Sequence, residues 1–222
     1  MTHTSSTDRS RFYFIIFSMA LGILLLVIDS LLSYGWITAA WWGYGLSLMY
    51  VIYALVKKDR LLTKFIIFAL AAGFTELLPD NWLVKFTGTL IYPQDEPMLL
   101  SSPAYMPFSW LVVLVQMGYL GWWASRKIGL LKASLALGVM GALLIPLYEH
   151  WAINAGWWHY INTKMIGTVP YYIILAEGLL MITVPFILQR VGRSQYYIAL
   201  LWGIAEGFVM WLACIIAWFV LG

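Results

Sequence analysis

The segment LLTKFIIFALAAGFTELLP, residues 61–79, is one long apolar run that contains a carboxylate, Glu76, near its end. About 20 helical residues cross a hydrocarbon core of about 30 Å, so a run of this length predicts a membrane-spanning helix. The whole chain has the same character, because 63% of its 222 residues are hydrophobic and 10% are charged. A water-soluble core of this size does not need so much apolar surface, and we therefore expect an integral membrane protein.

Seven segments are apolar and long enough to be membrane spans. They are residues 12–34, 37–56, 61–79, 105–123, 130–152, 169–189 and 195–221. The sequence therefore predicts an all-α, polytopic bundle of seven transmembrane helices over residues 12–222, preceded by a polar tail at residues 1–11. The first span lacks a small-residue cleavage site after a short apolar region, so we expect an anchor and not a signal peptide. No second domain is indicated.

The basic residues predict the orientation of this bundle. Eleven of the 13 Lys and Arg residues flank the span ends that lie on the side of the N-terminus, and only Lys85 and Lys164 fall on the other side. The positive-inside rule then places the N-terminus in the cytoplasm and the C-terminus outside, with the inner or plasma membrane of the cell as the expected location. The net charge of +3 fits this bias and does not indicate nucleic-acid binding. The sequence indicates no oligomeric state.

The two long outer loops, residues 80–104 and 153–168, are rich in aromatic residues and proline instead of charge. Irregular backbone at membrane depth needs partners for its polar groups, so loops of this composition are expected to fold back over the helix ends.

Five carboxylates lie within or at the ends of the predicted spans, with no basic residue at comparable depth: Asp29, Glu76, Glu149, Glu177 and Glu206. With a rise of 1.5 Å per residue, their positions predict that all five line one cavity in the outer half of the bundle. An unpaired ionised carboxylate there costs several kcal/mol, so such groups are expected to be neutral much of the time. A neutral carboxyl group in a dry cavity is a proton donor.

Structural roles compete with this interpretation at two of the five positions. A hydrogen bond between helices explains Asp29 equally well, and close helix packing explains Glu206. The functional interpretation is favoured at Glu76 and Glu149, which each precede an aromatic outer loop. It is also favoured at Glu177, whose small neighbours allow a ligand to approach.

The histidines and the single cysteine do not have the spacing of a metal site. His150 and His159 are not at positions i and i+4 of one helical face, and Cys214 is the only cysteine. We therefore expect neither a metal ion nor another cofactor, and no disulfide.

Two stretches of the chain resemble membrane enzymes of carotenoid biosynthesis. The first resembles the bisanhydrobacterioruberin hydratase type at Glu76, Thr87, Gly88, Tyr92, Pro103, Pro107 and Trp110. The second resembles the lycopene cyclase domain at Glu149, Gly156, Trp157, Tyr160, Pro170 and Glu177. The integral-membrane terpene cyclases of fungal meroterpenoid pathways are a third similar group, with about this length and helix count.

These resemblances imply a terpene cyclase that starts its reaction by protonation, without a metal ion, on a hydrophobic isoprenoid or prenylated lipid in contact with membrane lipids. Glu76, Glu149 and Glu177 are then the candidate catalytic acids and bases. The candidate substrate-binding residues are Asp29, Trp82, Tyr92, Trp110, Trp157, Tyr160, Tyr171 and Glu206. Aromatic rings beside an acid are suited to stabilise carbocations.

Three other functions remain open from the sequence, one of them a seven-helix receptor or chaperone-like scaffold. A carotenoid hydratase, which adds water to a carbon–carbon double bond, fits the same residues. A proton-coupled transporter also uses intramembrane acids, although clustering of the acids toward one side weakens that interpretation. A retinal-binding seven-helix protein is excluded, because the last span contains no lysine.

Overall fold

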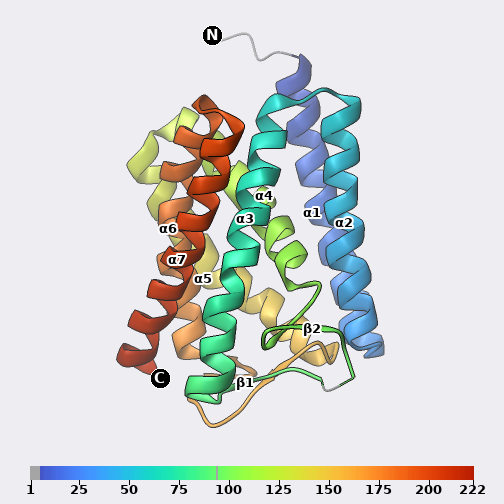
Figure 1. Cartoon of the computed structure of the whole chain (residues 1–222), viewed down its shortest axis with the longest axis vertical. Helices are drawn as coiled ribbons and strands as arrows, with labels where there is room; N and C mark the ends of the chain where they lie inside the picture. Colours follow the sequence, from blue (N-terminus) through green and yellow to red (C-terminus); the bar gives the residue numbers. More distant parts are fainter. Residues whose placement is uncertain (1–5, 94) are drawn as a thin grey trace.

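The computed structural model describes residues 6–93 and 95–222, and seven α-helices make up most of them (Figure 1). The helices are α1 (Ser6–Leu32), α2 (Trp36–Val56), α3 (Arg60–Trp82), α4 (Met106–Ile128), α5 (Leu130–Asn154), α6 (Tyr171–Arg193) and α7 (Tyr196–Leu221). The prediction of an all-α chain with seven long helices is confirmed for this part of the sequence.

Six of the helices in the described ranges are long and apolar enough to cross a membrane, and α4 does not meet that criterion. Helix α4 lies inside the bundle, where it packs against α1, α2, α3, α5 and α6. Because other helices surround α4, a polar side chain on it can find a partner within the protein; the Gln116 amide donates to the Tyr50 hydroxyl at 2.9 Å. The outer helices expose large apolar side chains such as Phe219, which suits contact with lipid.

Two glycines allow helices to approach very closely. A Cβ atom at Gly203 on α7 would lie 2.2 Å from the carbonyl oxygen of Phe68 on α3. A Cβ atom at Gly73 on α3 would lie 2.3 Å from the carbonyl oxygen of Pro107 on α4. Small residues at such contacts increase van der Waals packing between membrane helices. Helix α3 is therefore held tightly on both sides.

Gly73→Ala is expected to destabilise the protein by about 1–3 kcal/mol, because the new methyl group overlaps backbone that cannot rotate away. Gly45→Ala on α2 is the matched control, since a Cβ atom there meets nothing within 4 Å. Thermal unfolding in detergent should show a lower Tm for Gly73→Ala alone. Equal Tm values for the two variants would contradict the close contact of α3 with α4.

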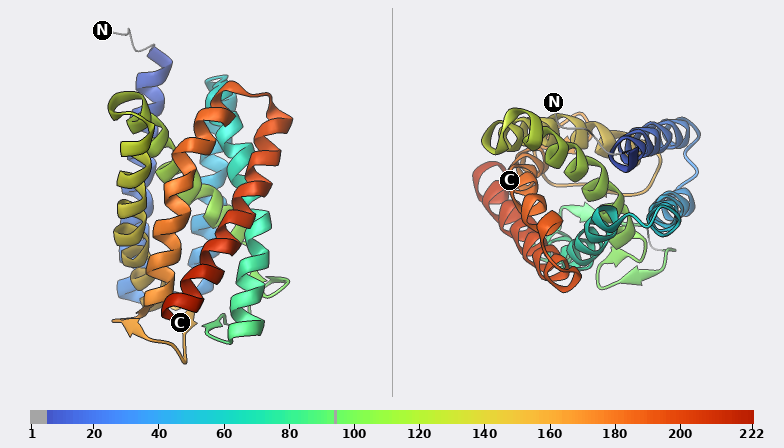
Figure 2. Two further views of the ribbon diagram at one scale, coloured as in Figure 1. Left: turned by 90° about the vertical axis from the view of Figure 1, so that its left-hand side faces the viewer. Right: turned by 90° about the horizontal axis from the view of Figure 1, so that it is seen from above.

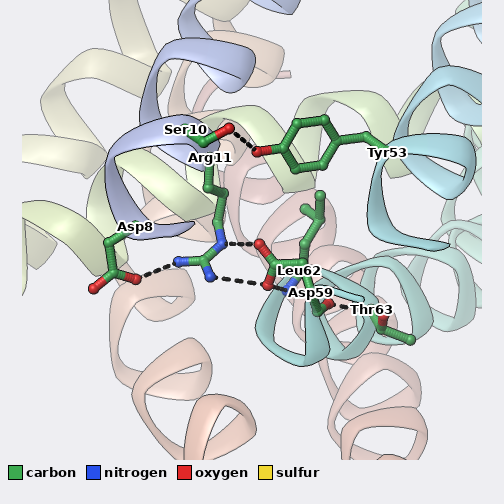
Figure 3. Close-up of polar contacts among 7 residues, drawn as sticks. All are labelled: Asp8, Ser10, Arg11, Tyr53, Asp59, Leu62 and Thr63. Carbon is green, nitrogen blue, oxygen red and sulfur yellow. Dashed lines mark hydrogen bonds and ion pairs between the residues drawn. The ribbon is translucent and has the colours of Figure 1, made fainter. Parts of the chain in front are cut away.

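The polar N-terminal segment is not a tail throughout. Residues 1–5 lie outside the described residues, but residues 6–11 belong to α1, which corrects the predicted boundary. The reason is a buried ion pair (Figure 3): the Arg11 guanidinium contacts the Asp59 carboxylate through Nε–Oδ2 at 2.6 Å and Nη2–Oδ1 at 2.9 Å. Asp59 also caps α3 by accepting from the backbone N–H of Leu62 at 3.1 Å. This cluster joins α1 to the α2–α3 turn.

The two long loops lie at the opposite end of the bundle from the N-terminus (Figures 1 and 2). Strand β1 (Leu90–Ile91) of the first loop pairs antiparallel with β4 (His159–Tyr160) of the second. The hairpins β2 (Met98–Leu99) with β3 (Ser102–Pro103), and β5 (Met165–Ile166) with β6 (Val169–Pro170), complete the loops. The prediction that the loops fold over the helix ends is confirmed.

Helix α3 extends beyond the predicted end at residue 79. Pro79 lies inside α3, which continues to Trp82 and then into the π-helical turn η1 (Leu83–Thr87). Gly88, with φ 64°, ends the turn in the left-handed conformation that favours glycine. This extension makes Asp80 a helical residue and not a loop residue.

Candidate functional site

A cavity of about 70 Å³ lies near the loop end of the bundle, between α3, α4, α5, α6 and α7 and beneath the paired loops. Its lining includes Glu76, Asp80, Leu83, Leu90, Tyr92, Met106, Trp110, Ile145, Tyr148, Glu149, Trp158, Tyr160, Ile173, Glu177, Met210 and Cys214. The three carboxylates predicted to be catalytic therefore share one cavity, although they come from three helices.

A fourth carboxylate, Asp80, lines the same cavity and was missed from the sequence. It lies one helical turn after Glu76 on α3, and the two carboxyl groups interact. The Tyr92 hydroxyl donates to Asp80 Oδ2 at 2.6 Å. The i, i+4 spacing of the two acids was a signal in the sequence, but the predicted span ended at residue 79, between them.

The carboxylates differ in their hydrogen bonds. Glu149 Oε2 accepts from the Trp158 indole N–H at 2.8 Å and from the Tyr160 hydroxyl at 3.1 Å. In contrast, the Oε2 atom of Glu76 and the Oε2 atom of Glu177 are both buried without a hydrogen-bond partner. Donated bonds stabilise a carboxylate anion, whereas a buried oxygen without partners disfavours charge. Glu149 is therefore suited to accept a proton, and Glu76 and Glu177 are suited to hold one.

Aromatic side chains form much of the remaining wall. Tyr92, Trp110 and Tyr160 were predicted, and Tyr148 and Trp158 are additional members. Burial raises the pKa of the Tyr92 and Tyr160 hydroxyls well above its usual value, so both remain proton donors at neutral pH. Each donates to a cavity carboxylate, which fixes the orientation of that group.

The expectation that all five intramembrane acids share this cavity is wrong for Asp29. Its Oδ2 accepts from the Trp157 indole N–H at 2.6 Å and from the Thr38 hydroxyl, and its Oδ1 accepts from the backbone N–H of Tyr34 at 3.1 Å. Asp29 is thus a cross-link between α1, the start of α2 and the loop after α5. Neither Asp29 nor Trp157 lines the carboxylate cavity.

Three further predicted residues also lie outside the cavity. Glu206 on α7 is fully buried and accepts from the Thr183 hydroxyl of α6 at 2.9 Å, so it links two helices. Trp82 stacks on Phe86 with ring centroids 5.4 Å apart, and Tyr171 is 42% exposed. Position along a helix gave the depth of these side chains but not the direction in which they point.

The histidine beside Glu149 has its own partners. His150 Nδ1 lies 2.9 Å from the Thr168 hydroxyl, and its Nε2 lies 3.1 Å from the Asn154 amide. Among residues 6–93 and 95–222, no three or more His, Cys, Asp and Glu side chains are grouped as metal ligands.

Glu96, in the loop before β2, is a buried acid outside the helices. It is 6% exposed, and both carboxyl oxygens lack a hydrogen-bond partner. Burial raises the pKa of Glu96 to about 7, although the nearby Tyr105 hydroxyl opposes the rise. The Glu96 carboxyl group therefore ionises more easily when the loop opens and exposes it to water than when it is buried, the closed state.

The loop that carries Glu96 is expected to open as the pH rises. A raised pKa stabilises the closed loop below the ordinary value of about 4.3, and this stabilisation is lost progressively as the pH rises to about 7. Hydrogen exchange of residues 95–104, corrected for intrinsic rates, should increase between pH 5 and pH 8 by about tenfold or more. The variant Glu96→Gln should show no such pH dependence. A pH dependence that persists in this variant would assign the effect to another group.

The fold and the cavity together define an all-helical protein compatible with an integral membrane protein, with acids gathered near one end of the bundle. Residues 77–221 match the model of a family described as Domain of unknown function (DUF6989), and the chain belongs to that family. The matched range contains Asp80, Glu149 and Glu177 and begins one residue after Glu76. No curated protein and no solved structure matches the chain.

Proposed function

We propose that this protein is a membrane enzyme that protonates a carbon–carbon double bond of an isoprenoid lipid and directs its cyclisation. The observation that supports this most is the shared cavity, which Glu76 and Glu177, each with one buried oxygen that lacks a hydrogen-bond partner, line together with the hydrogen-bonded Glu149. Such a pair of environments separates a proton donor from a proton acceptor.

The proposed reaction adds one proton to the substrate and removes another, so the substrate and the product have the same composition. The Glu76 carboxyl group gives its proton to one carbon of the double bond, whose π electrons form the new C–H bond and leave a carbocation on the other carbon. A second double bond of the substrate attacks that carbocation and closes the ring. The Glu149 carboxylate then takes a proton from the carbon next to the final cation, and a new double bond forms. Exchange with solvent returns a proton to Glu76 and removes the one held by Glu149, which restores both groups.

The aromatic wall supports the intermediate stage of this reaction. Trp110, Tyr148 and Trp158 line the cavity in which positive charge would develop. A cation over an aromatic ring gains about 0.5–2 kcal/mol per contact. Tyr92 hydrogen bonds to Asp80 and Tyr160 to Glu149, and each thereby orients the acid.

The size of the cavity limits what enters it. A volume of about 70 Å³ is well below the roughly 300–1,000 Å³ of sites that enclose a drug-sized ligand. The cavity therefore suits the reacting end of a lipid and not a whole polyprenyl chain. The remainder of the chain must lie elsewhere on the protein or in the bilayer.

The proposal includes seven membrane spans, with α4 as the central one, a cytoplasmic N-terminus and an external C-terminus in the cell membrane. The C-terminal ends of α2, α4 and α6 lie at the same end of the bundle as the start of α1 (Figure 1), and each contains basic residues or is followed directly by them. The cavity and the loops then face the outer leaflet.

Expression in hosts that make squalene, lycopene or prenylated quinones, followed by profiling of neutral lipids, tests this function. A new product with the mass of its precursor is expected for cyclisation. A product that has gained the mass of one water would instead identify a hydratase acting through the same acids. Unchanged lipid profiles in all hosts would contradict the proposed function.

A further inference from the structure

A second hollow, of about 370 Å³, lies between α1 and α2 on the outer side of the bundle. Along α2 its lining extends from Thr38 to Met49, which corresponds to about 16 Å of helix. This length is close to half of a hydrocarbon core of about 30 Å, the depth of one leaflet. The hollow, here called the α1–α2 groove, is therefore as long as a hydrocarbon chain that extends through one leaflet.

The chemistry of the groove is that of a lipid-chain site. Leu25, Ile28 and Met49 contribute apolar surface, and Trp41 at its edge is 75% exposed on the outside of the bundle. The one charged residue in its lining, Asp29, already accepts hydrogen bonds through both carboxyl oxygens. Both Asp29 oxygens are thus occupied by donors of the protein itself, and the rest of the lining is mainly apolar, so the groove fits an apolar chain that enters from the bilayer.

Four aromatic rings in contact with one another lie between the groove and the carboxylate cavity. Trp42 and Trp157 line the groove, and Tyr148 and Trp158 line the cavity. The ring centroids of Trp42 and Tyr148 are 5.4 Å apart, and those of Trp157 and Trp158 are 5.9 Å apart. The larger hollow thus adjoins the small reactive one, on the side of the bundle formed by α1 and α2.

We infer that the α1–α2 groove binds the isoprenoid chain of the substrate, and that the reacting end of the chain enters the carboxylate cavity past the side chains of Trp42 and Trp157. This inference rests on the proposed function and supplies the volume that the cavity lacks. Asp29 is then a positioning residue, because it holds the indole of Trp157 at the boundary between the two hollows.

Gly45→Phe provides the test, because Gly45 lines the groove and a Cβ atom there meets nothing within 4 Å. The new ring should fill the groove without displacing backbone. Leu48→Phe is the matched control, since Leu48 is 58% exposed on the same helix and does not line the groove. The wild type, the two variants and Glu76→Gln would each be reconstituted in nanodiscs with a geranylgeraniol analogue that carries a diazirine. The labelled residues would then be identified by mass spectrometry.

Photolabelling of the groove residues is expected in the wild type, in Leu48→Phe and in Glu76→Gln. Gly45→Phe should lower that labelling about tenfold, equivalent to about 1.4 kcal/mol of binding free energy. Labelling of the groove no stronger than that of lipid-facing Phe219, or unchanged in Gly45→Phe, would overturn the inference. Labelling does not require turnover. Groove labelling together with unchanged lipid profiles in all hosts would therefore contradict the proposed function and still support the chain-binding site.

Discussion

Glu76→Gln is expected to abolish product formation while the protein still folds and inserts. Glutamine has nearly the same shape as glutamic acid but cannot donate a proton to carbon. Loss of a general acid typically costs about 10²–10⁴-fold in rate. Turnover of an isoprenoid precursor by purified protein in nanodiscs measures the effect, and Glu149→Gln should show a comparable loss because it removes the proton acceptor.

Glu206→Gln is the matched control for this experiment. Glu206 is as deeply buried as Glu76 but lies outside the cavity, where it accepts a hydrogen bond from Thr183. An amide oxygen can accept the same bond, so activity should remain within a few-fold of the wild type. If Glu76→Gln kept as much activity as Glu206→Gln, the assignment of the acid would be wrong.

Arg11→Met is expected to cause the largest loss of stability, about 3–5 kcal/mol, because it leaves a buried carboxylate without its counter-ion. Arg11 and Asp59 are both buried, and their side chains are joined by two short hydrogen bonds. Asp59 would keep only the cap that it forms with the Leu62 backbone. Thermal unfolding of the purified protein in detergent measures the change.

Arg9→Met separates the loss of this ion pair from the loss of one positive charge near the N-terminus. Arg9 is exposed and lies only two residues away on the same helix. Its substitution should leave Tm nearly unchanged. An equal decrease in Tm for both variants would show that charge, and not the buried contact with Asp59, stabilises this end of the bundle.

The sequence was sufficient to predict the helices because a membrane span has a length fixed by the bilayer and a composition fixed by lipid. The end of α3 was mistaken because Pro79 usually breaks a helix in water. In a packed membrane bundle the carbonyl group that proline leaves unpaired can be satisfied locally, and α3 continues through Pro79. Because the predicted helix ended at residue 79, Asp80, one of the four cavity acids, was assigned to a loop.

The direction of each side chain was harder to predict than its depth. In a soluble helix the polar face identifies the buried face, but in these helices almost every face is apolar. Asp29 and Glu206 were therefore placed in the cavity by depth alone. In the structure, Asp29 instead accepts a hydrogen bond from Trp157, and Glu206 accepts one from Thr183. Trp157 and Trp158 are adjacent in the sequence yet line different hollows.

Turnover in D₂O tests the central claim most directly, namely that a carboxyl group in equilibrium with solvent delivers a proton to a substrate carbon. Wild-type protein in deuterated buffer should yield a product with one deuterium bound to carbon at the position where the reaction starts. A product formed at the normal rate but without deuterium at any carbon would contradict the account.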